Sequence, residues 1–381
     1  MRRPRITHLI HNDGPGGGPK AVTQHLHFGM QEAERSAIVG GGGRIVEYCR
    51  AHGLRCRRLP LRRPWMWMAG VPLLVVELIR NKPDLLVLHG QWGAVLGAMA
   101  GRIARVRMVY IAHWPTFYGD WDAYRAMRNH LCELLPCRWC VRVITLCESS
   151  RYEYFRRDMV DYDKLVVLPN PVDLTTLPTP SDALAVRARH RWDPGQFHVV
   201  SVGRLAEQKR VDWLLRSWKI VQERAGGAAR LWIVGDGDEE AKLKALARSL
   251  GVTETCVFLG AQPTGIAYVA AADLVVATSM FESFGYVVAE AQACGKAVVT
   301  NKVHGICDIM KDGVQGYLVN PGDFFSFADR IINLMQDAAL RSRMGEAGRQ
   351  AVLAYSREKV MAAYDRLFTC LLARTGNADT P

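Results

Sequence analysis

Two glutamates, Glu282 and Glu290, flank a glycine at the start of an expected helix, and this spacing suits a phosphorylated ligand. The apolar run 272–279 predicts a buried strand, and a helix should begin near Ser283. Gly285 would then lie in the first turn, where backbone N–H groups and the helix dipole can face an anion. Carboxylates repel phosphate, so their natural partners are hydroxyl groups, such as those of a sugar and a ribose. The competing interpretation is a helix cap and a solvated surface glutamate.

Two cations follow the first strand of the same half of the chain. Arg204 and Lys209 come after Gly203, at the carboxyl end of a strand expected over 197–203. In that position they can clamp a diphosphate between them. Surface solvation of both side chains is the competing interpretation.

Two further clusters have spacings that metals use. Asp236 and Asp238 lie in a strand-to-helix turn, but the glycines around them favour close backbone approach over a cage of oxygen ligands. Cys137 and Cys140 have zinc-like spacing, yet no second close pair completes a ligand set, and Cys147 is expected in a strand. The sequence therefore favours neither a magnesium nor a zinc site.

A glycine-rich stretch follows the first expected strand, 5–11. Gly16, Gly17 and Gly18 would form a turn that lets backbone approach a ligand, with Lys20 near the start of the next helix. The glycine spacing fits neither the P-loop nor the dinucleotide fingerprint. This stretch is a weak signal by itself.

Apolar runs alternate with helical segments along the whole chain, which predicts an α/β protein with parallel, doubly wound sheets. In such sheets ligands bind beyond the carboxyl ends of the strands. His89 and His113 stand at two such ends, although a lone histidine there is more often structural than catalytic. The other strands are expected over 37–40, 84–89, 107–113, 142–147, 164–168, 230–235, 256–259, 273–279, 297–300 and 316–319.

Length and composition limit the class of protein. A chain of 381 residues suggests two domains, and the Pro- and Thr-rich stretch 169–180 marks the boundary between them. Ten cysteines spread through a chain of this size indicate reduced thiols, and no long apolar run predicts a signal peptide or a membrane span. We therefore expect a cytoplasmic protein.

A net charge of +12 predicts acidic partners. The basic, Trp-rich segment 55–68 would suit the inner face of an anionic membrane, or would be a solvated charge run leading into a core helix. Nucleic acid is disfavoured, because the basic residues are dispersed and no nucleic-acid motif is present.

The order of these motifs resembles the retaining GT-B glycosyltransferases of family four. The resemblance is strong from 199 to 323, where it rests on the Gly-Arg-(x)4-Lys turn, the Gly235–Gly237 turn, Phe258-Leu259-Gly260, Glu282-(x)7-Glu290 and Gly313-(x)2-Gly316. It is looser in the first half, where Pro171 replaces the glycine of the family's Pro-Asn-Gly-Val-Asp motif and Gly-Pro-Lys stands where Gly-x-Glu is common.

The resemblance implies two Rossmann-like domains facing a central cleft. Residues 1–172, joined by a C-terminal helix over 356–372, would bind the acceptor, and residues 173–355 would bind a nucleotide-sugar. It also implies a metal-independent reaction without a cofactor, in which the departing phosphate takes the acceptor's proton during front-side attack. A glutamate nucleophile is the competing mechanism.

The resemblance also assigns roles to the candidate residues. Arg204, Lys209 and the backbone of Phe284 and Gly285 would bind the donor diphosphate. Glu290 would bind the ribose. Glu282 and His113 would be the catalytic residues, with Glu282 on the transferred sugar and His113 on the sugar or the acceptor.

The donor would be a UDP-sugar or, less favoured, a GDP-sugar. The acceptor would be a glycan, a lipid-linked or a small molecule, in the biosynthesis of cell-envelope polysaccharides or glycolipids. Two alternatives remain open: a non-catalytic nucleotide-sugar-binding module and a GT-B epimerase.

Overall fold

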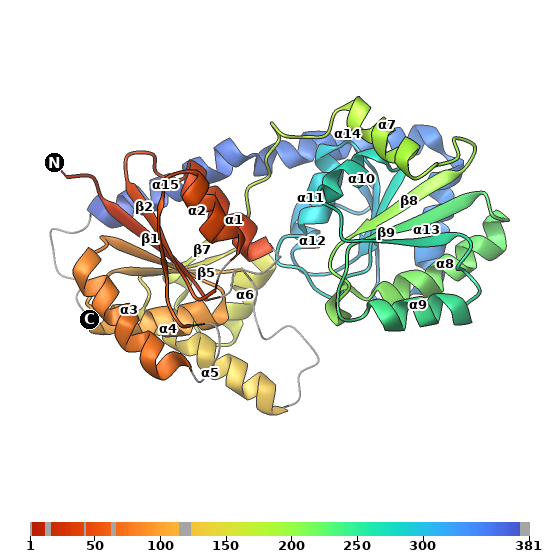
Figure 1. Ribbon diagram of the computed structural model, residues 1–381. Helices are drawn as coiled ribbons and strands as arrows, with labels where there is room; N and C mark the ends of the chain where they lie inside the picture. The colour runs from red at the N-terminus through yellow and green to blue at the C-terminus, as the bar shows by residue number, and fades with distance from the viewer. Residues whose placement is uncertain (1, 12–16, 42, 62–65, 114–122, 374–381) are drawn as a thin grey trace. The chain divides into compact units, whose positions relative to one another are not determined.

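The computed structural model describes residues 2–11, 17–41, 43–61, 66–113 and 123–373, and the chain divides into two compact units. One unit is Met1–Pro171 together with Arg357–Pro381, and the other is Val172–Ser356. Each unit contains a parallel sheet with helices packed around it (Figure 1). The prediction of two doubly wound, Rossmann-like domains is confirmed.

The first unit is built on a seven-stranded sheet with the strand order β3-β2-β1-β4-β5-β6-β7. The order reverses beside β1, which pairs with both β2 and β4, and ligands bind at the carboxyl end of such a switch point. The strands are β1 (Arg5–Ile10), β2 (Glu34–Val39), β3 (Arg55–Arg58), β4 (Leu85–His89), β5 (Met108–Ala112), β6 (Arg142–Thr145) and β7 (Leu165–Val167).

The C-terminal helix α15 belongs to this first unit. Tyr364 of α15 is fully buried and donates a hydrogen bond to the backbone oxygen of Leu168 at 3.2 Å, and Asp365 accepts one from the backbone of Met30 at 2.8 Å. The helices of the unit are α1 (Gly17–Phe28), α2 (Arg44–Ala51), α3 (Trp67–Asn81), α4 (Gln91–Ile103), α5 (Ala123–Trp139), α6 (Glu148–Arg156) and α15 (Arg357–Ala373).

Two local features of this unit differ from the expectations. The basic run at 55–58 forms the edge strand β3, which lacks the apolar alternation of an ordinary strand and is specified by parallel pairing with β2. Arginines on an edge strand also discourage pairing with other chains. Cys147 is not in a strand: it is buried and caps α6, where its sulfur accepts from the backbone N–H of Ser150 at 3.4 Å.

The second unit is built on a six-stranded sheet with the order β10-β9-β8-β11-β12-β13. Its strands are β8 (Phe197–Val202), β9 (Ala229–Val234), β10 (Cys256–Gly260), β11 (Leu274–Ala277), β12 (Val298–Asn301) and β13 (Gly316–Val319). Its helices are α7 (Pro180–Arg189), α8 (Val211–Ala225), α9 (Glu240–Ser249), α10 (Gly265–Ala271), α11 (Tyr286–Ala293), α12 (Ile306–Ile309), α13 (Phe324–Gln336) and α14 (Ala338–Val352).

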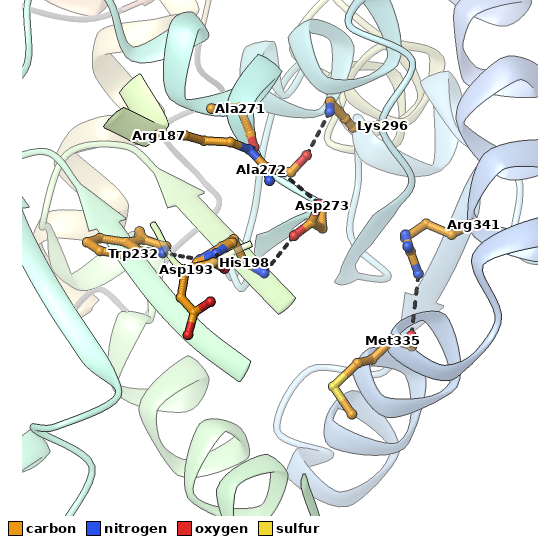
Figure 2. Close-up of polar contacts among 10 residues, drawn as sticks. All are labelled: Arg187, Asp193, His198, Trp232, Ala271, Ala272, Asp273, Lys296, Met335 and Arg341. Carbon is orange, nitrogen blue, oxygen red and sulfur yellow. Dashed lines mark hydrogen bonds and ion pairs between the residues drawn. The ribbon is translucent and has the colours of Figure 1, made fainter. Parts of the chain in front are cut away.

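A carboxylate joins α7, β8 and β11 at the amino ends of these strands (Figure 2). Asp273 accepts from the guanidinium of Arg187 and from the backbone N–H of His198, both at 2.8 Å. Lys296 donates to the backbone oxygen of Ala272 at 2.7 Å. These contacts give Asp273 a structural role. A ligand site is expected at the opposite, carboxyl ends of β8, β11 and β12.

Candidate active site

The loop after β8 packs tightly on the loop after β9. The backbone N–H of Leu205 donates to the oxygen of Asp236 at 2.7 Å. A Cβ on Gly235 would lie 1.9 Å from the oxygen of Gly203, and one on Gly237 would lie 2.3 Å from the oxygen of Leu205. Both positions therefore require glycine, and the glycines around Asp236 serve close backbone approach.

Lys209, near the end of the loop after β8, forms an ion pair with Glu282. The distance from Nζ of Lys209 to Oε1 of Glu282 is 2.5 Å, and the hydroxyl of Ser279 donates to the same oxygen at 2.8 Å. The two charged side chains are only 26% and 16% exposed, so the pair is partly desolvated.

Hydrogen bonds connect this loop to the loop after β11. The backbone N–H of Met280 donates to the oxygen of Gln208 at 2.9 Å, and the Gln208 amide donates to the oxygen of Phe281 at 3.0 Å. The hydroxyl of Thr278 donates to the backbone oxygen of Arg210 at 2.9 Å. The loops that carry Lys209 and Glu282 are therefore positioned as one assembly.

Three polar residues of this assembly were missed by the sequence analysis: Thr278, Ser279 and Asn301. All three are buried, and the side-chain amide of Asn301 donates to the backbone oxygen of Thr278 at 2.8 Å. They follow or end the neighbouring strands β11 and β12, so their position at adjacent strand ends is the signal that could have found them.

Helix α11 begins at Tyr286, three residues after the predicted start, with Gly285 as its N-cap. Gly285 has φ +77° and makes no side-chain cap bond, and the positive end of the helix dipole at this position favours an anion. A Cβ on Gly305 would lie 2.4 Å from the backbone oxygen of Glu282. Glycine at position 305 therefore allows the Glu282 loop to pack closely against it. Phe284 is buried, so only its backbone can face a ligand.

Glu290 and Arg204 are the other two candidates of the second unit. Glu290 is the fifth residue of α11 and is half-buried. Glu282 precedes the helix, as the sequence analysis expected. Arg204 is exposed and makes no side-chain hydrogen bond or ion pair with the part of the chain that the structure describes. Its guanidinium is therefore available for an anion.

The remaining candidates belong to the first unit. Helix α1 begins at Gly17, so Gly17 and Gly18 start the helix and do not form a turn before it. Lys20 is exposed in its first turn. Gly16 lies outside the described residues.

His113 follows β5 and is hydrogen-bonded to other histidines. Its Nε2 lies 2.8 Å from Nδ1 of His89, and Nε2 of His89 lies 2.9 Å from Nδ1 of His8. His25 of α1 stacks on His8 with a ring distance of 5.6 Å. Burial lowers the pKa of His113 to about 4 and that of His8 to about 3, with Arg35 contributing at His8, so these rings are neutral near pH 7. The sequence analysis did not identify His8 and His25.

No group of three His, Cys, Asp or Glu side chains converges as a metal site within the described ranges. Cys137 and Cys140 are buried free thiols in the core of the first unit. A cavity of about 390 Å³ borders the loop after β8, but it opens beside α9. Its lining includes Arg210 and Lys242 and excludes both Lys209 and Glu282. The ion pair therefore lies outside this cavity.

Comparison with protein families gives two adjoining matches. Residues 17–176 match the family described as Glycosyltransferase Family 4, and residues 183–351 match Glycosyl transferases group 1. The first match covers β2 to β7, and the second covers all of β8 to β13.

Two curated relatives show the range of similarity. The chain is 32% identical over 314 residues to a D-inositol 3-phosphate glycosyltransferase of Arthrobacter sp. (strain FB24), covering 76% of this chain and 74% of that protein. It is 34% identical over 172 residues to an N-acetyl-alpha-D-glucosaminyl L-malate synthase of Bacillus anthracis, covering 45% and 44%. Several other matches likewise span about half of the relative's length.

Among solved structures, HepE of Anabaena in complex with UDP and glucose superimposes with a TM-score of 0.85 at 22% identity. The match covers 97% of this chain and 100% of the Anabaena chain. At this identity the likeness shows a common fold.

Proposed function

This chain belongs to glycosyltransferase family 4, with the GT-B fold, and we propose that it transfers a sugar from a nucleoside diphosphate sugar to a hydroxyl acceptor. UDP is the favoured nucleotide, a preference supported by the Anabaena neighbours solved with UDP and UDP-glucose. The acceptor class is a glycan, a lipid-linked or a small molecule, in the biosynthesis of envelope polysaccharides or glycolipids.

The ion pair between Lys209 and Glu282 is the observation that carries this proposal. It places a cation and a carboxylate 2.5 Å apart at the carboxyl ends of β8 and β11, near the N-terminus of α11. A sugar diphosphate presents both an anion and neutral hydroxyls, so it matches such a pair. Lys209 would turn to the phosphate, and Glu282 would accept hydrogen bonds from sugar hydroxyls.

The leaving group explains the remaining assignments. When the bond between the anomeric carbon and the diphosphate oxygen breaks, negative charge develops on the diphosphate. Lys209, Arg204 and the first-turn N–H groups of α11 would stabilise that charge. Two cations and a helix N-terminus can do this without a metal ion, which supports a metal-independent reaction.

Retention of the anomeric configuration is the stereochemical outcome we propose. The acceptor oxygen attacks the anomeric carbon from the side that the diphosphate leaves, and the departing phosphate oxygen takes the acceptor's proton. Glu290 would accept hydrogen bonds from the ribose hydroxyls. His113 would bind a hydroxyl of the sugar or the acceptor.

A transfer assay tests the proposal. Purified protein is incubated with UDP- or GDP-sugars and a panel of lipid-linked and soluble acceptors, with and without EDTA, and the product's anomeric configuration is read by proton NMR. Retained configuration with turnover that survives EDTA is the expected result. Inverted product would contradict retention, and nucleotide binding without any product would favour a binding module.

We also propose that the first unit attaches to an anionic membrane. No helix of the described ranges is both long and apolar enough to cross a bilayer. However, large apolar side chains are exposed on the neighbouring helices α3 and α4, with Met68 at 90%, Ile79 at 52% and Ile103 at 63%. Exposed apolar side chains on neighbouring helices could together contact the apolar part of a membrane surface.

The basic run 55–58 contributes less positive charge to membrane attachment than its sequence suggests. Arg55 and Arg57 lie 3.6 and 3.8 Å from Glu77 of α3, which offsets part of their charge. Trp67 donates its indole N–H to the backbone oxygen of Leu61 at 3.0 Å and packs on the core. The exposed side chains of α3 are therefore the main support for membrane attachment.

Vesicle flotation tests this attachment. The protein should float with vesicles containing anionic phospholipid, and Ile79→Glu should reduce its recovery. Leu184→Glu is the matched control, because Leu184 is 66% exposed on α7 of the other unit. Equal recovery with and without lipid would overturn the attachment.

A further inference from the structure

Three histidines of the first unit lie in a diagonal row across three adjacent strands. His89 at the end of β4 is in register with Ile10 of β1 and with Ile111 of β5. His8 lies two residues before Ile10, and His113 lies two residues after Ile111. Because side chains two residues apart in a strand point to the same face of a sheet, His8 and His89 share one face. His113 lies just beyond β5, and its hydrogen bond to His89 joins it to them. The row runs from the middle of β1 to the carboxyl end of β5.

The hydrogen bonds of this row join Nδ1 of one ring to Nε2 of the next. Nδ1 of His8 meets Nε2 of His89 at 2.9 Å, and Nδ1 of His89 meets Nε2 of His113 at 2.8 Å. A neutral imidazole carries one N–H, and each of these bonds needs one proton. If all three rings are neutral, the choice of tautomer at one ring therefore fixes the other two: either all three carry the proton on Nδ1, or all three carry it on Nε2.

The surroundings keep the rings neutral. His8 and His89 are 2% and 0% exposed, and desolvation lowers the pKa of both. Arg35 of β2 acts electrostatically on His8, whereas His113, His8 and His25 of α1 act on His89, and each of them disfavours a positive charge. Tyr364 of α15 packs edge-on against His25 at 4.4 Å.

The outer end of the row decides between the two arrangements. Nδ1 of His113 is buried and has no hydrogen-bond partner among the described residues. A buried N–H group without a partner is costly, whereas an unprotonated ring nitrogen can accept a hydrogen bond from a ligand. The arrangement with every proton on Nε2 leaves Nδ1 of His113 as such an acceptor.

We propose that His8 and His89 are positioning residues that hold His113 in the Nε2–H tautomer, so that its Nδ1 accepts a hydrogen bond from a hydroxyl of the sugar or the acceptor. The hydroxyl ligand rests on the sugar transfer proposed above, whereas the shared tautomer does not. His198 in the second unit shows the contrast, since Asp193 and Trp232 fix its tautomer without another histidine.

Long-range nitrogen-15 NMR of histidine-labelled protein at pH 7 tests the tautomer directly. His8, His89 and His113 should each show the Nε2–H pattern, with no imidazolium. Any one of them as the Nδ1–H tautomer, or charged, would overturn the proposal. This readout needs no substrate, so it stands even if no sugar is transferred.

Two substitutions of His8 test the coupling at a distance. In His8→Asn the side-chain oxygen can still accept from His89, whereas His8→Phe removes the acceptor. The Nδ1–H form of His113 should appear in His8→Phe only. In the transfer assay, kcat of His8→Phe should fall by roughly three- to tenfold, the worth of one hydrogen bond, with KM for the donor unchanged. Equal His113 tautomers in both variants would overturn the coupling, and equal kcat would overturn its part in transfer.

Discussion

Nζ of Lys209 lies 2.5 Å from Oε1 of Glu282, although the two residues are 73 positions apart and lie on loops after different strands. Each side chain therefore holds the other in place at the carboxyl edge of the sheet. A ligand that separates the two side chains must give Lys209 an anion and Glu282 hydrogen-bond donors such as hydroxyl groups.

Lys209→Ala should weaken donor binding and turnover together. The variant loses a charge-assisted contact of about 1.5–3 kcal/mol, so kcat/KM should fall about tenfold to a hundredfold. The measurement is steady-state kinetics with varied donor. Lys219→Ala is the control, because Lys219 is 48% exposed and lies 3.8 Å from Glu223, which is also exposed. Unchanged kinetics in Lys209→Ala would remove Lys209 from the site.

Glu282→Gln should lower kcat more than it lowers affinity for the free nucleotide. The amide keeps the size of the side chain but loses the charge that accepts from sugar hydroxyls, and free nucleotide lacks that sugar. Calorimetry with UDP and transfer kinetics separate the two effects. Glu223→Gln serves as the exposed control. A loss of UDP affinity as large as the loss of kcat would instead place Glu282 on the nucleotide.

Gly305→Ala should destabilise the second unit and slow transfer. Its φ is +77°, and a Cβ would meet the backbone of Glu282 at 2.4 Å. Gly322 has φ +85° with nothing within 4 Å, so Gly322→Ala should show only the cost of the left-handed backbone, about 1–2 kcal/mol. Urea unfolding of both variants gives the comparison. If Gly305→Ala lost less free energy of unfolding than Gly322→Ala, the Glu282 loop would be shown to move aside without a cost in stability.

Acid should destabilise the first unit through its buried histidines. The pKa of His113 and of His8 is lowered by burial from 6.5 to about 4 and about 3. Above pH 6.5 both the folded and the unfolded chain hold these rings neutral. Below it the unfolded chain takes up protons that the folded chain refuses, so stability falls as pH falls toward 4. The slope is at most about 1.4 kcal/mol per pH unit for each ring.

Urea unfolding between pH 8 and pH 4.5 measures this slope. His113→Asn should show a shallower fall on the acid side, while its difference from the native chain should be constant between pH 7.5 and 8. Outside the row itself, the groups that act on it are His25 of α1 and Arg35 of β2. An identical slope in His113→Asn would mean that this ring is charged in the folded protein.

Periodicity predicted most of the fold, because buried parallel strands read as apolar runs wherever they occur. It missed the edge strand β3, where Arg55, Arg57 and Arg58 carry no apolar signal and only pairing with β2 specifies a strand. It also placed the start of α11 early. Gly285 has a φ of +77°, so the helix starts only after it. The sequence shows that this residue is glycine but does not show its conformation.

The site residues were chosen from charge, spacing and resemblance, and their roles stay predictions. What sequence could not supply was pairing in space. Lys209 and Glu282 meet because β8 and β11 are neighbours, and His8 reaches His113 only through the register of three strands. Such contacts depend on strand order, which no local pattern encodes.

Thermal unfolding against UDP, GDP, ADP, TDP and their sugars, with and without EDTA, tests the central claim most directly. A ligand at a hundred times its Kd stabilises the native state by about 2.7 kcal/mol, enough to raise Tm measurably. We predict a selective rise with one nucleotide and its sugar, most simply UDP, that survives EDTA and is reduced in Lys209→Ala. No rise with any nucleotide, or a rise that EDTA abolishes, would contradict a metal-independent nucleotide-sugar site at Lys209 and Glu282.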